Sequence, residues 1–230
     1  MKIAGLQKLS LVDFPEHLSS IVFLQGCNFF CGYCHNPDLV TFDTDFGLTE
    51  ENILKDIKKN RKVIDGVVVS GGEPTIYATL PEFLKKIKEM ELKVKLDTNG
   101  TNPDQLDFLF RSWILDYIAI DIKTSFDKYH FVTNQKDVEE KVSASIRLAM
   151  LSNFPYEFRT TCVPGLVDEE VFETIGKRIK GAKKYCLQQF RPMNTLDKKF
   201  ENILPFLKEE LYKFKSILEK YVEKVEIRGI

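Results

Sequence analysis

Short apolar runs alternate along the chain with longer stretches in which apolar residues recur every three or four positions. The first pattern is typical of buried strands and the second of amphipathic helices. Strands are expected at Ser20–Gln25, Gly66–Ser70, Leu92–Asp97, Tyr117–Lys123, Tyr156–Cys162 and Tyr185–Phe190, with a seventh at Val225–Arg228. The chain therefore has the rhythm of repeated strand–helix units.

Capping residues mark where several helices begin. Thr49 precedes a helix expected at Glu50–Lys59, Asn102 precedes Pro103, and Asp168 precedes the stretch with Val171. Their side-chain oxygens can accept hydrogen bonds from the free backbone N–H groups of the first helical turn. Two further helices are expected, one opening at Pro81 and a long one after Pro205.

Six strands that alternate with helices predict a parallel sheet with right-handed crossovers, and so the α/β class. Six units are too few to close an eight-stranded barrel, so we expect a partial, open (β/α)6 barrel. The whole chain, 1–230, is expected to form one domain, with 1–20 as an N-terminal extension and 205–230 as a C-terminal helix and strand. In such folds the chemistry lies at the carboxyl ends of the strands.

Composition excludes several classes of protein. The 230 residues include 33 Lys and Arg and 34 Asp and Glu, a net charge of −1, with 43% apolar and 29% charged residues. This is ordinary globular usage, which argues against global disorder and against a general binder of nucleic acid or anionic membranes. We expect a cytoplasmic protein, because no apolar run reaches the roughly 20 residues of a membrane span and the start lacks an export signal.

The five cysteines point to chemistry. Cys27, Cys31 and Cys34 fall within eight residues, and the odd total argues against a disulfide framework. Cys162 and Cys186 lie in expected strands and are interpreted as small buried apolar residues. His17 and His130 are isolated in the sequence and are interpreted as surface or structural residues, and the aromatic helix containing Phe206, Tyr212 and Phe214 as core.

Polar residues follow four consecutive expected strands. The first strand leads into the cysteine cluster, the second ends at Gly71-Gly72-Glu73, the third at Asp97-Thr98 and the fourth at Asp121-Ile-Lys123. Alternation along a strand puts Lys95 with Asp97, and Asp121 with Lys123, on the face opposite the apolar residues. Arg159, Gln189 and Arg191 are expected to extend this inward set. Because an unpaired buried ion costs several kcal/mol, these charges need charged partners or a charged ligand.

The cysteine spacing leaves more than one interpretation open. Three thiolates with no fourth nearby suit an iron–sulfur cluster with one iron left free for a substrate. A structural zinc site would need His35 as fourth ligand, although His35 follows Cys34 directly, against the usual ligand spacing. The same string matches the haem-attachment pattern C-x-x-C-H, which the lack of an export signal disfavours.

Cys27-x3-Cys31-x2-Cys34 followed by Gly71-Gly72-Glu73-Pro74 resembles the radical S-adenosylmethionine (SAM) enzymes. The strings FLQGCNFFCGYCHNPDLV, SGGEPT, KLDTNGT and DYIAIDIK are similar to activating enzymes of glycyl-radical enzymes. Within these, the chain resembles most the anaerobic ribonucleoside-triphosphate reductase activating proteins in their longer form. The resemblance spans nearly the whole chain.

The resemblance implies a role for each matching residue. It assigns Cys27, Cys31 and Cys34 to three irons of one 4Fe-4S cluster, and SAM to the fourth iron. Residues assigned to SAM or to its surroundings are Tyr33, Asn36, Gly71, Gly72, Glu73, Asp97, Thr98, Asp121 and Lys123, with a monovalent cation near Asp97, Thr98 and Asp121. Arg191 stands where some activators carry histidine, and a contact from it to SAM is a further expectation.

The resemblance also implies the reaction. Reductive cleavage of SAM gives methionine and a 5′-deoxyadenosyl radical, which abstracts a hydrogen atom from a glycine Cα of a partner enzyme. The expected partner is anaerobic ribonucleotide reductase, and the expected electron donor a flavodoxin or ferredoxin. Alternatives are activation of a pyruvate formate-lyase-like enzyme, a small-molecule reaction like that of 7-carboxy-7-deazaguanine synthase, and a zinc-binding module without catalysis.

Overall fold

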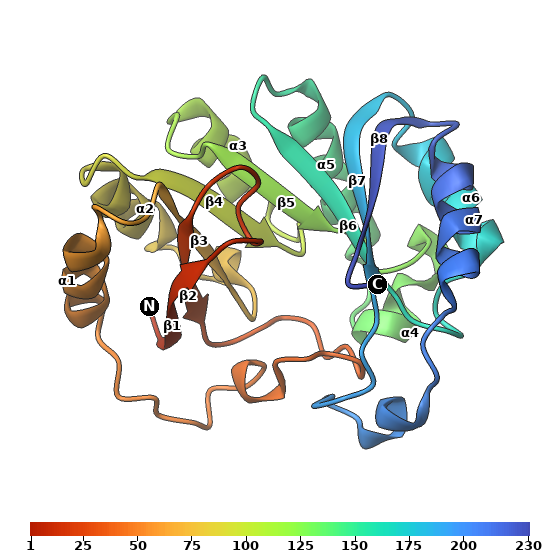
Figure 1. Cartoon of the computed structure of the whole chain (residues 1–230), viewed down its shortest axis with the longest axis horizontal. Helices are drawn as coiled ribbons and strands as arrows, with labels where there is room; N and C mark the ends of the chain where they lie inside the picture. Colours follow the sequence, from red (N-terminus) through yellow and green to blue (C-terminus); the bar gives the residue numbers. More distant parts are fainter.

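One curved sheet of eight strands, in chain order from edge to edge, organises the computed structural model, which describes residues 1–230 (Figure 1). The strands are β1 (Ile3–Ser10), β2 (Ser19–Leu24), β3 (Gly66–Gly71), β4 (Lys93–Thr98), β5 (Tyr117–Asp121), β6 (Tyr156–Cys162), β7 (Ala182–Gln189) and β8 (Val222–Arg228). Only β1 and β2 are antiparallel, and each later strand is parallel to the one before it. Because β1 and β8 do not pair, the barrel stays open, and the expected partial barrel is confirmed.

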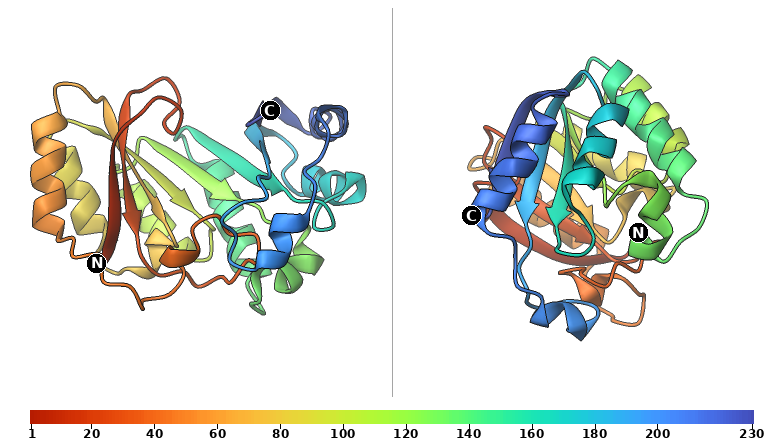
Figure 2. Two further views of the ribbon diagram at one scale, coloured as in Figure 1. Left: turned by 60° about the horizontal axis from the view of Figure 1, so that its bottom comes forward. Right: turned by 90° about the vertical axis from the view of Figure 1, so that its right-hand side faces the viewer.

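The helices cover the outer face of this sheet (Figure 2). They are α1 (Glu50–Asn60), α2 (Leu80–Lys88), α3 (Pro103–Arg111), α4 (Tyr129–Thr133), α5 (Glu139–Leu151), α6 (Glu169–Arg178) and α7 (Lys208–Leu218). Short 3-10 helices occur at Pro37–Leu39, Pro74–Ile76, Phe126–Lys128 and Lys198–Asn202. None of the helices combines the length and the apolar character that crossing a membrane requires.

All seven predicted strands exist, with ends that shift by one to three residues and with β6 reproduced residue for residue. The three predicted caps are also confirmed. The side chains of Thr49, Asn102 and Asp168 accept hydrogen bonds from backbone N–H groups three residues later, at 3.2, 3.2 and 2.8 Å. Local sequence therefore determines where α1, α3 and α6 begin.

Three of the strands and α-helices were not predicted: β1, the five-residue α4 and α5. β1 lies inside the expected N-terminal extension, where half-exposed and exposed residues obscure any strand pattern. α5 begins at Val138 without a side-chain cap, and its buried face includes Ser143 and Ser145 beside apolar residues. A helix that packs through small polar residues lacks the apolar stripe on which sequence patterns depend.

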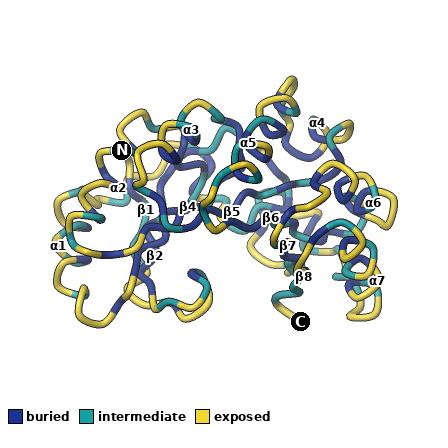
Figure 3. The backbone as a smooth tube through the Cα atoms, turned by 90° about the horizontal axis from the view of Figure 1, so that it is seen from above, coloured by how far each residue is buried: buried dark blue, intermediate teal, exposed yellow.

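The two faces of the sheet differ in character. Outward-facing residues such as Val69, Leu96, Ile120 and Phe158 are fully buried under the helices and belong to one large apolar core (Figure 3). On the inner side, a small apolar cluster of Phe14, Ile21, Val68 and Tyr117 fills the region around β2 and β3. The inner faces of β4 to β6 instead carry charged side chains, including the fully buried Lys95 and Glu157.

Replacing Leu96 by alanine should lower the free energy of unfolding by about 3 kcal/mol, because it opens a cavity between β4 and the helices. Leu151→Ala is the matched control, since this side chain is 85% exposed and its loss should cost less than about 0.5 kcal/mol. Urea unfolding followed by circular dichroism measures both. Equal effects of the two variants would contradict this assignment of the core.

Candidate functional site

A cavity of about 210 Å³ lies at the carboxyl ends of β2 to β6, where the polar motifs were expected to meet. Eleven of the thirteen predicted site residues line it: Cys27, Cys31, Cys34, Tyr33, Asn36, Gly71, Gly72, Asp97, Thr98, Asp121 and Lys123. Arg159 and His35 also line it. Two predicted residues, Glu73 and Arg191, lie outside its lining.

The three clustered cysteines are free thiols on the loop that follows β2. Burial, reinforced by the charge of Glu73, raises the pKa of Cys27 to about 12, and burial raises the pKa of Cys31 to about 11. Both are therefore protonated at neutral pH until a metal displaces the protons. No three Cys, His, Asp or Glu side chains converge as they would around a single metal ion.

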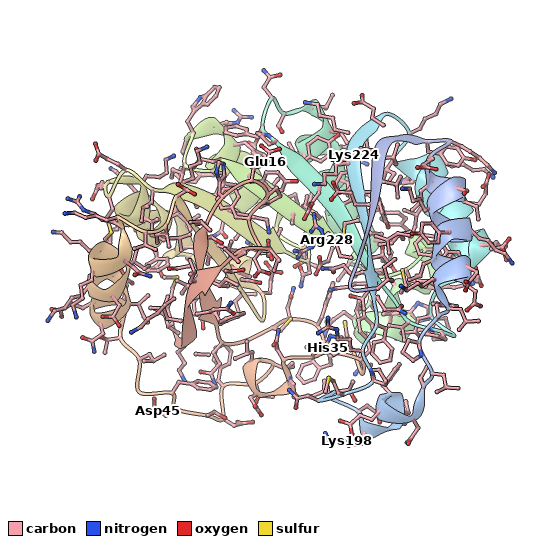
Figure 4. The ribbon with its side chains drawn as sticks, viewed as in Figure 1. Glu16, His35, Asp45, Lys198, Lys224 and Arg228 are labelled. Carbon is pink, nitrogen blue, oxygen red and sulfur yellow. The ribbon has the colours of Figure 1, made fainter.

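His35 is engaged away from the cysteines. Its ring stacks on Phe190 with centroids 5.5 Å apart, and its Nε2 lies 2.8 Å from the carbonyl oxygen of Arg191. Figure 4 shows His35 beside the chain that leaves β7. In this arrangement His35 supports the loop instead of completing a zinc site.

The cysteine loop is held by two distant segments, and sequence reasoning missed both. The N–H groups of Leu196 and Asp197 donate to the carbonyl oxygens of Cys34 and Gly32, at 3.1 and 2.8 Å. Gly32 packs so closely on this segment that an added Cβ would lie 2.5 Å from the ring of Phe200. The local sequence pattern at 194–200 does not predict this contact, because the contact joins segments more than 160 positions apart.

A second anchor joins the cysteine loop to the end of β4. Asn28 donates to the Thr101 hydroxyl at 2.7 Å and accepts from the Asn99 side chain at 2.8 Å. Asn99 in turn accepts from the hydroxyl of Thr101. These three buried or half-buried side chains connect the loop after β2 to the end of β4, across β3, and so fix the loop relative to the barrel.

Gly71 and Gly72 lie too close to neighbouring backbone to carry a side chain. A Cβ on Gly71, where φ is +127°, would lie 2.2 Å from the carbonyl oxygen of Leu24, and one on Gly72 would lie 2.0 Å from that of Gly26. The missing side chains therefore make room for the backbone after β2 and not only for a cofactor. Both glycines still present their backbone to the cavity.

Glu73 is fully buried and connects the ends of β3 and β4. One carboxylate oxygen accepts from the backbone and hydroxyl of Thr75 and from the Thr98 hydroxyl, at 3.0, 2.6 and 2.7 Å. The other accepts from the Asn99 N–H at 2.6 Å. Burial raises the pKa of Glu73 although these hydrogen bonds oppose it. The side chain thus acts here as a brace between strands.

Five charges of alternating sign form a chain across the inside of the barrel. Lys95 pairs with Asp97, Asp97 with Arg159 at 3.0 Å, Arg159 with Asp121 at 2.8 Å, and Asp121 with Lys123 at 2.9 Å. Three cations and two carboxylates leave a net charge of +1 in a buried setting. Such a surplus favours an anionic ligand at the open end of the chain of charges, beside Lys123.

The pKa shifts agree with this arrangement. Burial disfavours the charge on Asp121, but Arg159 and Lys123 outweigh it and lower the pKa to about 2. Burial likewise opposes the charge on Lys123, and Asp121 outweighs it, so its pKa is raised. Asp121 and Lys123 are therefore ionised at neutral pH, whereas burial lowers the pKa of Lys95.

Two features of the cavity fit a group that would complete it. The Tyr33 hydroxyl is buried without any hydrogen-bond partner, although Tyr33 lines the cavity. Three thiols and the Lys123 ammonium line the same space. Soft sulfur ligands beside an ammonium group suit an iron–sulfur cluster next to an anionic group.

Arg191 is exposed and lies on a neighbouring cavity of about 750 Å³, which it shares with Arg159, Arg228 and His35. Gln189 lines this cavity with Arg159 and Arg191, as expected, and so does Gln188. Gln189 pairs in register with Cys162 and donates to the Phe206 carbonyl at 2.7 Å, while Gln188 pairs with Thr161.

Residues 21–177 match the family model described as the radical SAM superfamily. The chain belongs to this superfamily. Its members carry a 4Fe-4S cluster and SAM, and the cavity offers three thiols and the Lys123 ammonium to such groups.

Several radical SAM relatives match over nearly their whole length. A protein of Methanocaldococcus jannaschii, provisionally named a glycyl-radical enzyme activating enzyme, is 40% identical over 234 residues, covering 99% of this chain and 96% of its own. The pyruvate formate-lyase 1-activating enzyme of Escherichia coli K12 is 28% identical over 250 residues, covering 97% of each.

Solved radical SAM structures share the fold. SuiB of Streptococcus suis, bound to S-adenosylmethionine, superposes with a TM-score of 0.65 at 14% identity, covering 91% of this chain and 52% of its own. Coproporphyrinogen III oxidase of Escherichia coli gives 0.61 at 14% identity, covering 89% and 52%. This chain therefore spans about half of each of those two chains.

Arg159→Gln should lower the free energy of unfolding by about 3 kcal/mol, because it removes the cation between two buried carboxylates. Arg111→Gln is the control, since Arg111 pairs with Asp107 while 79% exposed and should contribute less than about 1 kcal/mol. Urea unfolding of both variants tests this. A loss for Arg159→Gln as small as that of the control would contradict the network.

Lowering the pH should reduce the free energy of unfolding, because Asp121 becomes protonated. Its pKa lies at about 2 in the folded state against 3.8 ordinarily, so the stabilisation is complete above about pH 4 and disappears as the pH falls toward 2. The advantage of the native protein over Asp121→Asn, about 2 kcal/mol at neutral pH, should shrink over that window. Urea unfolding of both proteins at several pH values measures it, and a pH-independent difference would contradict the assignment.

Proposed function

We propose that this radical SAM enzyme activates a glycyl-radical enzyme by abstracting a hydrogen atom from the Cα of one glycine in that partner. The observation that carries the proposal is the 40% identity, over 99% of this chain, to the relative named for this activity. The match to pyruvate formate-lyase 1-activating enzyme over 97% of both chains supports it.

In this proposal Cys27, Cys31 and Cys34 hold one 4Fe-4S cluster, with SAM beside it. When bound, the cluster and SAM together supply a 5′-deoxyadenosyl radical. The chain's own part is to position SAM and exclude water. Lys123, the last cation of the inner network, binds the SAM carboxylate, and the backbone at Gly71 and Gly72 accepts from its ammonium group.

The remaining predicted residues receive roles that follow their placement. Tyr33 and Asn36 line the cavity and contact the adenosyl part, where the unpartnered Tyr33 hydroxyl can find a hydrogen bond. Glu73 acts through Thr98 and Asn99, which it positions. Arg191 reaches the site only from the neighbouring cavity, so we assign it to the partner's side of SAM.

A monovalent cation at Asp97, Thr98 and Asp121 would have to compete with Arg159. This guanidinium already lies between the two carboxylates, at 3.0 Å from Asp97 and 2.8 Å from Asp121. Binding of the cation would therefore require Arg159 to turn toward another anion, such as SAM.

The open side of the barrel suits a macromolecular substrate. β1 and β8 are edge strands that do not pair with each other, so a loop of a large partner can approach from the side. We propose anaerobic ribonucleotide reductase as this partner, on the resemblance of the motifs, and a flavodoxin or ferredoxin of the cytoplasm as electron donor.

Cys31→Ala should abolish iron binding in anaerobic reconstitution and reduce SAM cleavage to below a hundredth of the native rate, because only two sulfur ligands remain. Cys162→Ala is the control, since Cys162 is fully buried on the outer face of β6, away from the cavity. Iron content and 5′-deoxyadenosine formation under reductant are the measurements. Full iron loading by Cys31→Ala would refute the proposed ligand set.

The partner is tested by mixing the reduced, reconstituted protein and SAM with a candidate enzyme and recording the electron paramagnetic resonance spectrum. A glycyl radical is expected with anaerobic ribonucleotide reductase and none with pyruvate formate-lyase. The reverse result would reassign the partner. SAM cleavage without a radical on either protein would favour a small-molecule substrate.

A further inference from the structure

A second cavity, of about 710 Å³, lies at the opposite end of the barrel from the cysteine loop. It is formed where β4 to β8 begin and by the loop between β1 and β2, and its lining includes Phe14, His17, Lys93, Trp113, Phe154, Tyr156, Lys183 and Lys224. Because β2 to β8 are parallel, this end lies a full strand length from the site at their carboxyl ends. Cavities of about 300–1,000 Å³ are typical of small-molecule sites.

Aromatic rings line one part of this cavity. Trp113, the only tryptophan of the chain, is 72% exposed and its ring centroid lies 5.1 Å from that of Phe154. Its backbone adopts φ +54°, a conformation that is uncommon for a bulky residue. An exposed indole on a strained turn gains nothing from the protein core, but it offers a flat face to a planar ligand.

Lysines line the other part, and two of them form no ion pair. Lys93 donates to His17 Nε2 at 2.8 Å, and the Lys183 ammonium lies 6.0 Å from the centre of the Tyr156 ring. The acidic residues of the lining do not neutralise these two. Asp116 pairs with Lys88, and Glu16 is exposed on the loop that faces Lys224 (Figure 4).

The neighbouring cations are partly compensated from within the barrel. Lys184 and Lys224 both pair with Glu226, at 3.1 and 2.8 Å, and Lys184 also lies 3.6 Å from Glu157. Arg228 shares the same two carboxylates. The surplus of positive charge at this end therefore resides on Lys93 and Lys183, at the mouth of the cavity.

We propose that this cavity binds a nucleoside phosphate. A purine base would stack against Trp113 and Phe154, and the phosphates would pair with Lys93 and Lys183. Aromatic rings and free ammonium groups in one cavity match a ligand that is planar at one end and multiply anionic at the other. The inference stands apart from the radical chemistry, because none of these residues belongs to the cysteine-lined cavity.

The test is ATP binding by the reconstituted protein in the presence of saturating SAM, measured by equilibrium dialysis. A change in Trp113 fluorescence on addition of ATP reports binding near this residue, and this signal is absent in Trp113→Phe. ATP should bind, and Lys93→Gln with Lys183→Gln should weaken it at least tenfold. The matched control, Lys55→Gln with Lys58→Gln on the exposed side of α1, should leave it unchanged.

Three results would overturn the proposal. If ATP does not bind, or if SAM displaces it, the second cavity is not a nucleotide site. Tripolyphosphate binding as tightly as ATP would show a bare polyanion site in which the rings take no part. If the Lys93/Lys183 double variant bound ATP as tightly as the native protein, these two lysines would have no part in binding. SAM cleavage by that variant at the native rate would show that it is folded.

Discussion

The molecule depends on the pairing of charges inside its barrel. Lys95, Asp97, Arg159, Asp121 and Lys123 form an uninterrupted chain of ion pairs on the inner faces of β4, β5 and β6. An isolated charge at any of these positions would carry a desolvation penalty of several kcal/mol, which a properly placed partner offsets. The charges that line the site are therefore stable only because β4, β5 and β6 are neighbours in the sheet.

The same order explains how a flexible, cysteine-bearing loop is held still. Glu73 braces the ends of β3 and β4, and Asn28 joins the loop to Asn99 and Thr101 at the end of β4. On the other side, the segment after β7 donates two backbone hydrogen bonds to the loop. The loop is thus held by hydrogen bonds from the end of β4 and from the segment after β7.

The barrel has a cavity at each end, and polar side chains connect the two. Tyr117 belongs to the second cavity, donates to Glu157 at 3.3 Å and lies 5.9 Å from the ammonium of Lys95, which begins the chain of ion pairs. Apolar residues around Phe14 fill the remaining interior beside β2 and β3. The inner face of the sheet is therefore apolar beside β2 and β3 and charged along β4 to β6.

Much of the fold, and the superfamily, could be predicted from local sequence. Apolar runs located seven strands, capping side chains located three helix starts, and the motif of Cys27, Cys31 and Cys34 pointed to the superfamily. These signals are local because a strand, a cap or a loop motif depends on residues only a few positions apart.

The tertiary structure decided what depends on distant partners. It showed that β1 pairs with β2, that Gln188 joins Gln189 beside Arg159, and that Glu73 is fully buried. It also revealed that Gly71 and Gly72 pack directly against the backbone of Leu24 and Gly26. Arg159 lies between two aspartates. Sequence patterns do not contain these facts, because each arises where strands separated by tens of residues come within a few ångströms.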